Sequence, residues 1–429
     1  MPPNYLEQDF EEHIEERLLA SGWRKGRSGD YDKALGQLSA ELLGFVQDTQ
    51  ADRYVQLEQQ YGADTPQKFC RRVAREIRNK GTLKILREGV KDRGVTFRLA
   101  YFQPRSGLNP EHQRLYGLNR LTVARQLYYS AGKKNSIDLV LFLNGLPIIT
   151  AELKNSLTNQ TVEHAVNQYK QDRNPKNEPL LQFKRCLVHF AVGSEKVLMT
   201  TRLRGSDTHF LPFNKDTENP VNPTGHKTAY LWEDIWQKDT LLTLISEYLC
   251  FETTDEIVYD EQQKKIVTQR DERLLFPRFH QLDAVRRILA DVKADGVGGS
   301  YLVQHSAGSG KSNSIAWLAH QLAGLYQRSA DTERMFDSII IVTDRRVLDR
   351  QLQDTVKQFE QTEGVVNCID KHSDQLRQAL ESNKDIIIST LQKFPVIAEK
   401  LADMRVKAAA LPSLSTKPIP ASQAKAPKT

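Results

Sequence analysis

A glycine-rich segment between an apolar run and an amphipathic stretch constrains the fold of this 429-residue chain more than any other feature. Residues 301–303 read Tyr-Leu-Val, residues 305–312 read His-Ser-Ala-Gly-Ser-Gly-Lys-Ser, and apolar residues then recur at helical spacing from Ile315 to Leu325. Strand, glycine loop, Lys-Ser and helix in this order are typical of a phosphate-binding loop in a parallel α/β sheet. The sequence therefore predicts an α/β region with a doubly wound parallel sheet.

The residue types of this loop suit the phosphates of a nucleoside triphosphate. Glycines let backbone N–H groups curl around phosphates, Lys311 would pair with the β- and γ-phosphate charges, and the Ser312 hydroxyl would ligate Mg²⁺. The strict pattern has glycine where His305 stands, so the prediction depends on the strand, loop and helix context. The alternative is a glycine-rich turn before an ordinary helix. The predicted cofactor-binding residues are Gly308, Ser309, Gly310, Lys311 and Ser312, with ATP and Mg²⁺ as cofactors.

Gln281 lies about thirty residues before the loop lysine, at the start of an apolar helical pattern. Its side-chain amide can both donate to and accept from an adenine edge, so we predict that it contacts the base. The alternative is a plain helix N-terminus.

A second candidate site lies in residues 136–154, which read as a β-hairpin turning at Asn144-Gly145. Asp138 opens the first strand, and Glu152 and Lys154 close the second on one face. A strict two-residue loop would send Asp138 to the opposite face from Glu152. Because a metal site requires the carboxylates to converge, we predict either an odd-length loop with Gly145 in the left-handed region or a bulge that restores the parity.

Two carboxylates and one ammonium on a face are what metal-assisted phosphodiester hydrolysis needs. Asp138 and Glu152 would hold Mg²⁺, and Lys154 would orient the attacking water or stabilise developing charge. Glu-x-Lys alone is a weak signal, since Asp291-Val292-Lys293 carries a similar pattern on a predicted helix. The alternative is an exposed, charged strand end.

The periodicity divides the chain into two α/β domains. Residues 1–252 begin with an amphipathic helix, continue as charged helices and then become a mixed sheet with flanking helices. Residues 253–272 are polar enough to be a linker, and residues 273–406 alternate strands (300–304, 338–343 and 385–390) with helices (311–326 and 347–359). Residues 407–429 are rich in Lys, Ala, Pro, Ser and Thr, so we expect a disordered or non-native tail.

Composition excludes several classes of protein. No stretch approaches the roughly 18 consecutive apolar residues of a membrane span, and no secretory leader is recognisable. The four cysteines lie far apart in the sequence. We therefore expect a cytoplasmic protein with reduced thiols and no membrane partner. The net charge of +6 permits a polyanionic partner without requiring one. Residues 71–80 are strongly basic, either as a solvated helix face or as a contact for the DNA backbone.

Together these features resemble the N-terminal part of the R (restriction and motor) subunit of type I restriction-modification enzymes, over roughly residues 5–395. The motifs that carry the resemblance are residues 7–11 (Glu-Gln-Asp-Phe-Glu), the hairpin with Asn-Gly-Leu-Pro and Glu-Leu-Lys, the Gln281 segment, the loop 305–312, residues 342–346 (Val-Thr-Asp-Arg-Arg) and residues 387–394 (Ile-Ile-Ser-Thr-Leu-Gln-Lys-Phe).

The resemblance implies a PD-(D/E)xK-type nuclease domain followed by a RecA-like motor lobe. The whole enzyme would be an ATP-dependent, site-specific deoxyribonuclease that cuts double-stranded DNA and works with methyltransferase and specificity subunits. By position, Asp138, Glu152 and Lys154 become the nuclease residues and Glu11 and Gln168 auxiliary residues. Asp344, Arg345, Thr390 and Gln392 fall in motifs that touch the DNA backbone.

This sequence departs from the family at two places. The family has a tyrosine four residues after the helix glutamine, where this sequence has Asp172, while Tyr169 follows Gln168 directly. After Phe394 the family continues to Asp-Glu-x-His, and this chain continues into the Ala/Pro/Lys tail. We therefore expect no ATP turnover by this chain alone. The alternative function is a catalytically disabled fragment that binds ATP or DNA without turnover.

Overall fold

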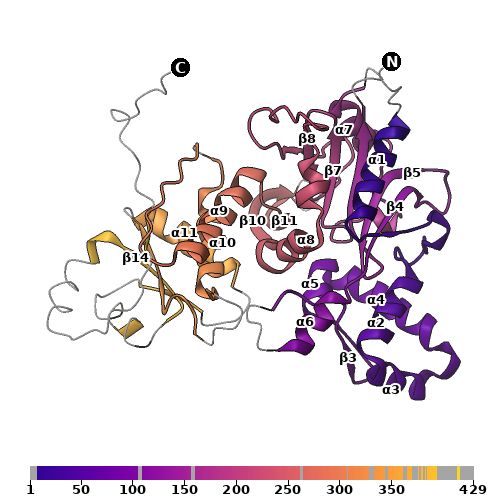
Figure 1. The fold of residues 1–429 in the computed structure, drawn as a ribbon, viewed down its shortest axis with the longest axis horizontal. Coiled ribbons are helices and arrows are strands. Elements are labelled where there is room, and N and C mark those ends of the chain that lie inside the picture. The colour runs from indigo at the N-terminus through magenta and orange to yellow at the C-terminus, as the bar shows by residue number, and fades with distance from the viewer. Residues whose placement is uncertain are drawn as a thin grey trace. The chain divides into compact units, whose positions relative to one another are not determined.

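The computed structural model describes residues 7–104, 109–155, 160–260, 264–306, 308–327, 333–343, 346–360, 365–369, 375, 378–379, 382, 384–393 and 413–415. The described residues form two compact units, one up to His280 and the other from Gln281 (Figure 1). The boundary therefore lies 28 residues after the end we expected for the first domain, residue 252. We describe each unit separately.

Unit 1 is built on a mixed seven-stranded sheet with the strand order β1-β4-β5-β6-β7-β8-β9. The β1–β4 and β6–β7 pairs are parallel and the remaining pairs are antiparallel. The strands are β1 (Arg24–Lys25), β4 (Leu121–Tyr128), β5 (Ser136–Leu143), β6 (Leu146–Lys154), β7 (Val188–Gly193), β8 (Val197–Thr200) and β9 (Leu211–Pro212). All residues of β6 and β7 are buried, which explains their nearly continuous apolar sequences. The mixed sheet predicted from the sequence is confirmed.

Helices lie along this sheet, and a separate group of helices lies beside it (Figure 1). Phe10, Ile14 and Leu18 of α1 are at most 1% exposed, so the predicted apolar stripe is the buried face of that helix. The helices of the unit are α1 (Glu7–Ala20), α2 (Ser39–Thr49), α3 (Ala51–Tyr61), α4 (Thr65–Lys80), α5 (Thr82–Glu88), α6 (Pro110–Gly117), α7 (Val162–Gln171) and α8 (Lys238–Thr243), with π-helical turns at Leu231–Ile235 and Leu244–Tyr248. A small hairpin, β2 (Val90–Asp92) with β3 (Val95–Phe97), packs with α3 and α4.

Most of the segment we expected to be a linker, residues 253–260 and 265–272, instead belongs to the strands of a long β-hairpin. Strands β10 (Cys250–Asp260) and β11 (Lys265–Leu275) pair antiparallel from Cys250 opposite Leu275 to Asp260 opposite Lys265. Ile257 and Ile266 are 77% and 72% exposed, so the ribbon buries neither side chain against a core. Such a ribbon shows no alternation of apolar and polar residues, and its polar composition resembles that of a linker.

Unit 2 contains a four-stranded, wholly parallel sheet with the order β13-β14-β12-β15. Its elements are α9 (Phe279–Asp295, which begins at the boundary), α10 (Lys311–Ala323), β12 (Ile339–Thr343), α11 (Arg346–Gln358), β13 (Val366–Cys368), β14 (Ile386–Thr390), a 3₁₀ turn at Leu391–Lys393 and β15 (Ser413–Ser415). Of the predicted alternation, the helix from residue 311, the strand at 338–343, the helix at 347–359 and the strand at 385–390 are confirmed as α10, β12, α11 and β14. Of the tail expected to be disordered, residues 413–415 form strand β15 beside β12, and the rest lies outside the described residues.

The predicted strand at residues 300–304 is wrong. Residues 301–306 have no regular secondary structure, and Tyr301, Leu302 and Val303 are 43%, 80% and 42% exposed. A strand requires a neighbour for its backbone N–H and C=O groups, and none of the described strands pairs with this run. Local apolar composition cannot reveal whether such a neighbour is present.

Two expectations about composition can be compared with the structure. All four cysteines are free thiols, three of them buried, as predicted from their spacing. None of the described helices combines the length and the apolar character that a membrane crossing needs.

Candidate functional site

The hairpin of β5 and β6 turns at Asn144-Gly145, as the sequence predicted. Asn144 and Gly145 have φ values of 50° and 82°, which a two-residue hairpin turn of type I′ requires. The turn is buried, and Asn144 anchors it: Oδ1 accepts from the Arg120 backbone N at 2.6 Å, and Nδ2 donates to the Leu99 carbonyl oxygen at 2.8 Å. The hairpin is thus fixed at its closed end.

A bulge in β6 brings Asp138 opposite Glu152. Next to the turn, Phe142 lies opposite Pro147, but Leu141 lies opposite Ile149, so residue 148 is an extra residue in β6. Continuing this register from the Leu139–Ala151 pair places positions 138 and 152 opposite each other, on one face of the sheet. Of the two solutions predicted for the parity problem, the bulge is confirmed and the odd-length loop is wrong.

The two carboxylates are both buried and interact. Oδ2 of Asp138 accepts from the Leu153 backbone N at 2.8 Å. Glu152 is 0% exposed, and burial, followed by the nearby Asp138 charge, raises its pKa well above the usual value. Oε2 of Glu152 is buried and has no hydrogen-bond partner among the described residues. A buried carboxylate oxygen without a donor, beside a second carboxylate, has the chemistry of a hard-cation ligand.

Arg173, two residues after the end of α7, neutralises part of this charge. Its Nε atom lies 2.6 Å from Oε1 of Glu152, and both side chains are buried. The Glu152 carboxylate in turn raises the pKa of Arg173 against the opposing effect of burial. Sequence reasoning missed Arg173, since a single arginine after a helix carries no distinguishing spacing.

Lys154 ends β6 two residues after Glu152, on the same strand face, and is 8% exposed. The three residues of the predicted nuclease set therefore lie on two adjacent strands and are all buried. An ammonium held this way beside two carboxylates can approach a phosphate that the carboxylates face.

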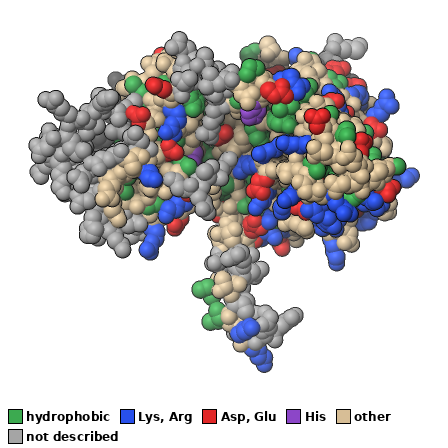
Figure 2. Space-filling view, turned by 90° about the horizontal axis from the view of Figure 1, so that it is seen from below, with side chains coloured by type: hydrophobic (Ala, Val, Ile, Leu, Met, Phe, Trp, Pro, Cys, Tyr) green, Lys and Arg blue, Asp and Glu red, His purple; other side chains and the backbone are tan. Residues whose placement is uncertain are grey.

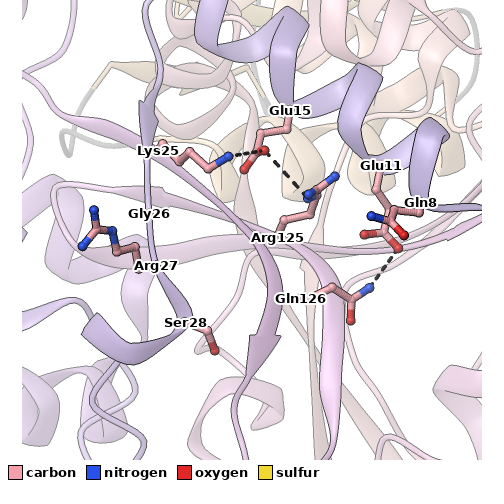
Figure 3. Close-up of a pocket in the computed structure, with 9 residues that line it drawn as sticks. All are labelled: Gln8, Glu11, Glu15, Lys25, Gly26, Arg27, Ser28, Arg125 and Gln126. Atoms are coloured by element: carbon pink, nitrogen blue, oxygen red, sulfur yellow. Dashed lines mark hydrogen bonds and ion pairs between the residues drawn. The ribbon is translucent and has the colours of Figure 1, made fainter.

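Gln126 of β4 connects the predicted auxiliary residue Glu11 to Asp138. Its Nε2 atom donates to Oε1 of Glu11 at 2.8 Å (Figure 3). The same atom donates to Oδ1 of Asp138 at 3.1 Å. Its φ of 49° is unusual for a residue with a side chain. Glu11 thus belongs to the hydrogen-bonded surroundings of the site, and Gln126 is a second residue that the sequence did not reveal.

An open pocket of about 390 Å³ lies beside these residues (Figure 3). Glu15, buried at its margin, lies 2.8 Å from Lys25 Nζ and 3.7 Å from Arg125 Nε. The pocket is lined by Gln8, Glu11, Glu15, Lys25, Gly26, Arg27, Ser28, Arg125 and Gln126. Charged groups of both signs therefore line the approach to Gln126.

Two residues before Glu152, Thr150 begins a series of buried hydrogen bonds that joins β6 to α7 and β7. Oγ1 of Thr150 lies 2.8 Å from the Tyr169 hydroxyl oxygen and 2.7 Å from Nδ1 of His189. Burial lowers the pKa of His189 to about 3, so this imidazole is neutral. The side chain of Gln168 is half-buried and has no hydrogen bond among the described residues. Tyr169 is therefore hydrogen-bonded to the site's strand, while an auxiliary role of Gln168 stays a prediction.

Metal ligation remains a prediction. Among the residues that the structure describes, no group of three or more His, Cys, Asp or Glu side chains is arranged to hold a metal ion. The candidate donors are the two carboxylates of Asp138 and Glu152, which would leave the other coordination positions to water and phosphate oxygens, as Mg²⁺ commonly does.

In unit 2 the glycine loop leads directly into α10. Gly308 and Gly310 have φ values of 74° and 79°, and Lys311 Nζ donates to the carbonyl oxygens of His305 and Ser306, each at 3.1 Å. Ser312 follows in the first turn of α10, and Ser309 lies in the loop and is buried. The predicted residues are thus brought together.

Gln281 lies against this loop. Its Nε2 atom donates to the carbonyl oxygens of Ser309 at 3.1 Å and Gly310 at 3.0 Å, and a Cβ on Gly310 would lie 2.4 Å from that atom. The structure thus shows Gln281 hydrogen-bonded to the glycine loop. Contact of Gln281 with adenine stays a prediction.

Two of the four residues predicted to touch DNA, Thr390 and Gln392, lie at the carboxyl end of the parallel sheet. Thr390 ends β14, is 4% exposed and lies opposite Thr343 at the end of β12. Gln392 is exposed in the following 3₁₀ turn. Asp344 and Arg345 lie outside the described residues. Ligands of open parallel sheets bind at this end.

Two family models match successive parts of the chain. Residues 4–208 match the type I restriction enzyme R protein N terminus, and residues 280–417 match the SWI2/SNF2 ATPase. The first match contains the whole β5–β6 hairpin, and the second contains the glycine loop. The second match indicates a helicase-like lobe in unit 2.

Curated relatives of this chain are also named as subunits of type I restriction enzymes. The chain is 27% identical over 349 residues to the type I restriction enzyme HindI endonuclease subunit of Haemophilus influenzae, covering 76% of this chain and 29% of the relative. It is 23% identical over 275 residues to the type I restriction enzyme SauCOLORF180P endonuclease subunit of Staphylococcus aureus, covering 64% of this chain and 26% of the relative. The chain thus spans less than a third of the length of these relatives. Residues 4–208 are thus similar to the N-terminal part of type I restriction enzyme R proteins, and the curated relatives support the same resemblance.

Proposed function

We propose that unit 1 is a PD-(D/E)xK-type nuclease that cleaves the phosphodiester backbone of double-stranded DNA with Mg²⁺. The observation that carries the proposal is the bulge at residue 148, which places Asp138 opposite Glu152. Lys154 follows Glu152 by two residues on the same face of β6. The relatives named endonuclease subunits support the same reaction. These matches do not favour the alternative, a disabled fragment that binds without turnover.

Each side chain would have a distinct task in cleavage. Asp138 and the unpartnered oxygen of Glu152 would hold Mg²⁺. When bound, this ion would lower the pKa of a water ligand and neutralise phosphate charge. Lys154 would orient the attacking water and stabilise the charge that develops on the phosphate. Arg173 would favour the charged form of the buried Glu152, because its guanidinium opposes the effect of burial on the pKa of that carboxyl.

Unit 2 would bind ATP as the first RecA-like lobe of a DNA motor. Backbone N–H groups of Gly308, Ser309 and Gly310 would cradle the phosphates, Lys311 would pair with them, and the Ser312 hydroxyl would ligate Mg²⁺. Gln281 would contact adenine. Asp344, Arg345, Thr390 and Gln392 would contact the DNA backbone. In a complete type I enzyme with methyltransferase and specificity subunits, ATP-driven translocation would be coupled to cleavage.

Plasmid nicking with matched lysine variants tests the nuclease proposal. We expect the full chain to nick supercoiled plasmid with Mg²⁺ and to stop when EDTA is added. Lys154→Ala should lower the rate by about 100-fold or more, because it removes the charge beside the scissile phosphate. Lys293→Ala, in the similar pattern Asp291-Val292-Lys293 on α9, should leave the rate unchanged, since Lys293 is exposed on a helix. Undiminished nicking by Lys154→Ala would overturn the site assignment.

A further inference from the structure

Helix α4 has two chemically opposite faces. Phe69, Val73 and Ile77 are at most 2% exposed and pack inward. The outward face carries the exposed residues Lys68, Arg71, Arg75 and Arg78, at intervals of three, four and three residues, with the half-buried Arg72 beside them. We call these five cations the α4 basic face. Figure 2 shows Lys and Arg side chains gathered over the unit that contains this helix.

Only part of this charge is neutralised within the protein. Arg72 pairs with Glu76 at 3.1 Å, and Lys68 pairs with Asp64 at 3.0 Å. For Arg71, Arg75 and Arg78, no ion pair or side-chain hydrogen bond occurs among the residues that the structure describes. A solvated helix face usually alternates charges of opposite sign at this spacing, whereas Arg71 and Arg75 are like charges four residues apart. Three of the five cations of the α4 basic face, Arg71, Arg75 and Arg78, therefore lack the anionic partners that an ordinary surface helix supplies.

The basic face borders a pocket of about 290 Å³ that has the lining of an anion site. Its walls are Tyr61, Lys68, Arg71, Arg72 and Arg75, with no carboxylate among them. Lys68 Nζ and, from the β2–β3 hairpin, Arg93 Cζ each lie 5.1 Å from the centroid of the Tyr61 ring. The Tyr61 ring thus brings the positive charges of Lys68 and Arg93 together beside the pocket.

We propose that the α4 basic face binds the sugar-phosphate backbone of double-stranded DNA, away from the carboxylates that cleave it. From Lys68 to Arg78 the helix axis advances about 15 Å, a length over which one strand of the duplex carries about four phosphates. Guanidinium groups match phosphate oxygens in bidentate geometry. The choice of DNA among polyanions rests on the proposed nuclease function. The face would hold the duplex without reading its sequence.

An acidic protein is the weaker fit. Protein interfaces bury an apolar centre surrounded by polar residues. None of the large apolar side chains that are exposed in the described part of the chain belongs to α4 or lines this pocket. Binding at this face would depend on charge alone, and binding to nucleic acid has that character.

The test compares two triple variants with equal loss of charge. One combines Arg71→Ala, Arg75→Ala and Arg78→Ala. The control combines Lys133→Ala, Lys134→Ala and Lys176→Ala, which are exposed residues in loops of the same unit. All six side chains are exposed and alanine favours helix, so the fold should be kept; circular dichroism checks this. Binding of a 30-base-pair duplex is measured by fluorescence anisotropy over a range of KCl concentrations.

We expect the arginine variant to raise the Kd at least 10-fold at 0.1 M KCl relative to the control. The slope of log K against log salt should fall by about 2 to 3, since each lost phosphate contact contributes about 0.9. The assay contains EDTA, so its result is independent of metal-dependent cleavage, and a failed nicking experiment would leave it intact. Equal affinity of the two variants would overturn the proposal. So would polyglutamate competing with DNA as well as unlabelled duplex does, since this would indicate an acidic protein partner.

Discussion

The Nε atom of Arg173 lies 2.6 Å from Oε1 of Glu152, and both groups are buried in unit 1. The carboxylate is therefore held between one cation and the negative charge of Asp138, with its second oxygen unpaired. Any change that removes the cation leaves a buried carboxylate beside another carboxylate. The protonation of Glu152 then depends on Arg173.

We expect Arg173→Met to lower nicking at pH 7 and to shift the rising limb of the pH–rate profile upward. Without the guanidinium, the pKa of Glu152 rises further, so a higher pH is needed to ionise it. Breaking a buried pair should also cost about 3 kcal/mol or more in the free energy of unfolding. Nicking over a range of pH and urea unfolding measure these two effects. Arg114→Met, which breaks an exposed pair with Glu111, is the control and should change neither. A wild-type pH profile for Arg173→Met would contradict this role.

Gly145→Ala should destabilise unit 1 much more than Gly22→Ala. Both glycines have positive φ, 82° and 94°, so alanine strains the backbone at both by about 1–2 kcal/mol. A Cβ on Gly145 would also lie 2.5 Å from the Leu38 carbonyl oxygen, while a Cβ on Gly22 would meet nothing within 4 Å. Urea unfolding followed by tryptophan fluorescence measures the difference. Similar losses in the two variants would show that the turn is not packed as described.

Gly310→Ala should weaken ATP binding, while Gly296→Ala should preserve it. Both positions have positive φ, 79° and 82°. A Cβ on Gly310 would collide with Gln281 Nε2 at 2.4 Å, whereas Gly296 has open space around it. Titration with a fluorescent ATP analogue measures the affinity of each variant. ATP binding of wild-type strength by Gly310→Ala would show that the contact between Gln281 and the glycine loop is not needed for nucleotide binding.

His189 should make unit 1 less stable in acid. Its pKa is about 3 in the folded chain and near 6.5 when exposed, so between these values the unfolded chain binds the extra proton. Stability therefore falls as the pH drops below 6.5, by up to about 1.4 kcal/mol per pH unit. His189→Gln should reduce this slope in urea unfolding between pH 7 and pH 5. His209→Gln changes an exposed imidazole and should leave the slope unchanged. An unchanged slope in His189→Gln would mean that the imidazole is protonated in the folded chain.

Features that depend on neighbouring residues in the sequence were predicted well. The hairpin was predicted as residues 136–154 with its turn at Asn144-Gly145, and the structure has β5 and β6 with those bounds. Continuous apolar residues and an Asn-Gly pair are sufficient for this inference. The parity that a convergent site requires left two solutions open, and the bulge was one of them.

Features that depend on distant partners were not predicted. Gln126 and Arg173 reach the carboxylates from β4 and from the end of α7, and neither residue type is unusual in the sequence. The run at residues 301–303 is apolar but finds no partner strand among the described ones. Residues 253–260 and 265–272 are polar but pair with each other as part of the β10–β11 hairpin. Tertiary pairing decides such cases.

The bulge at position 148 sets the facing of every residue that follows it in β6. Inserting one residue between Ile149 and Ala151, with the bulge kept, would exchange the two faces of the strand beyond the insertion. Glu152 would then leave Asp138, and Ala151 would take its place. Deleting Ile148 would instead give a regular hairpin in which Asp138 still lies opposite Glu152. The pairing of the two carboxylates should therefore survive loss of the bulge residue and be broken by gain of one residue beyond it.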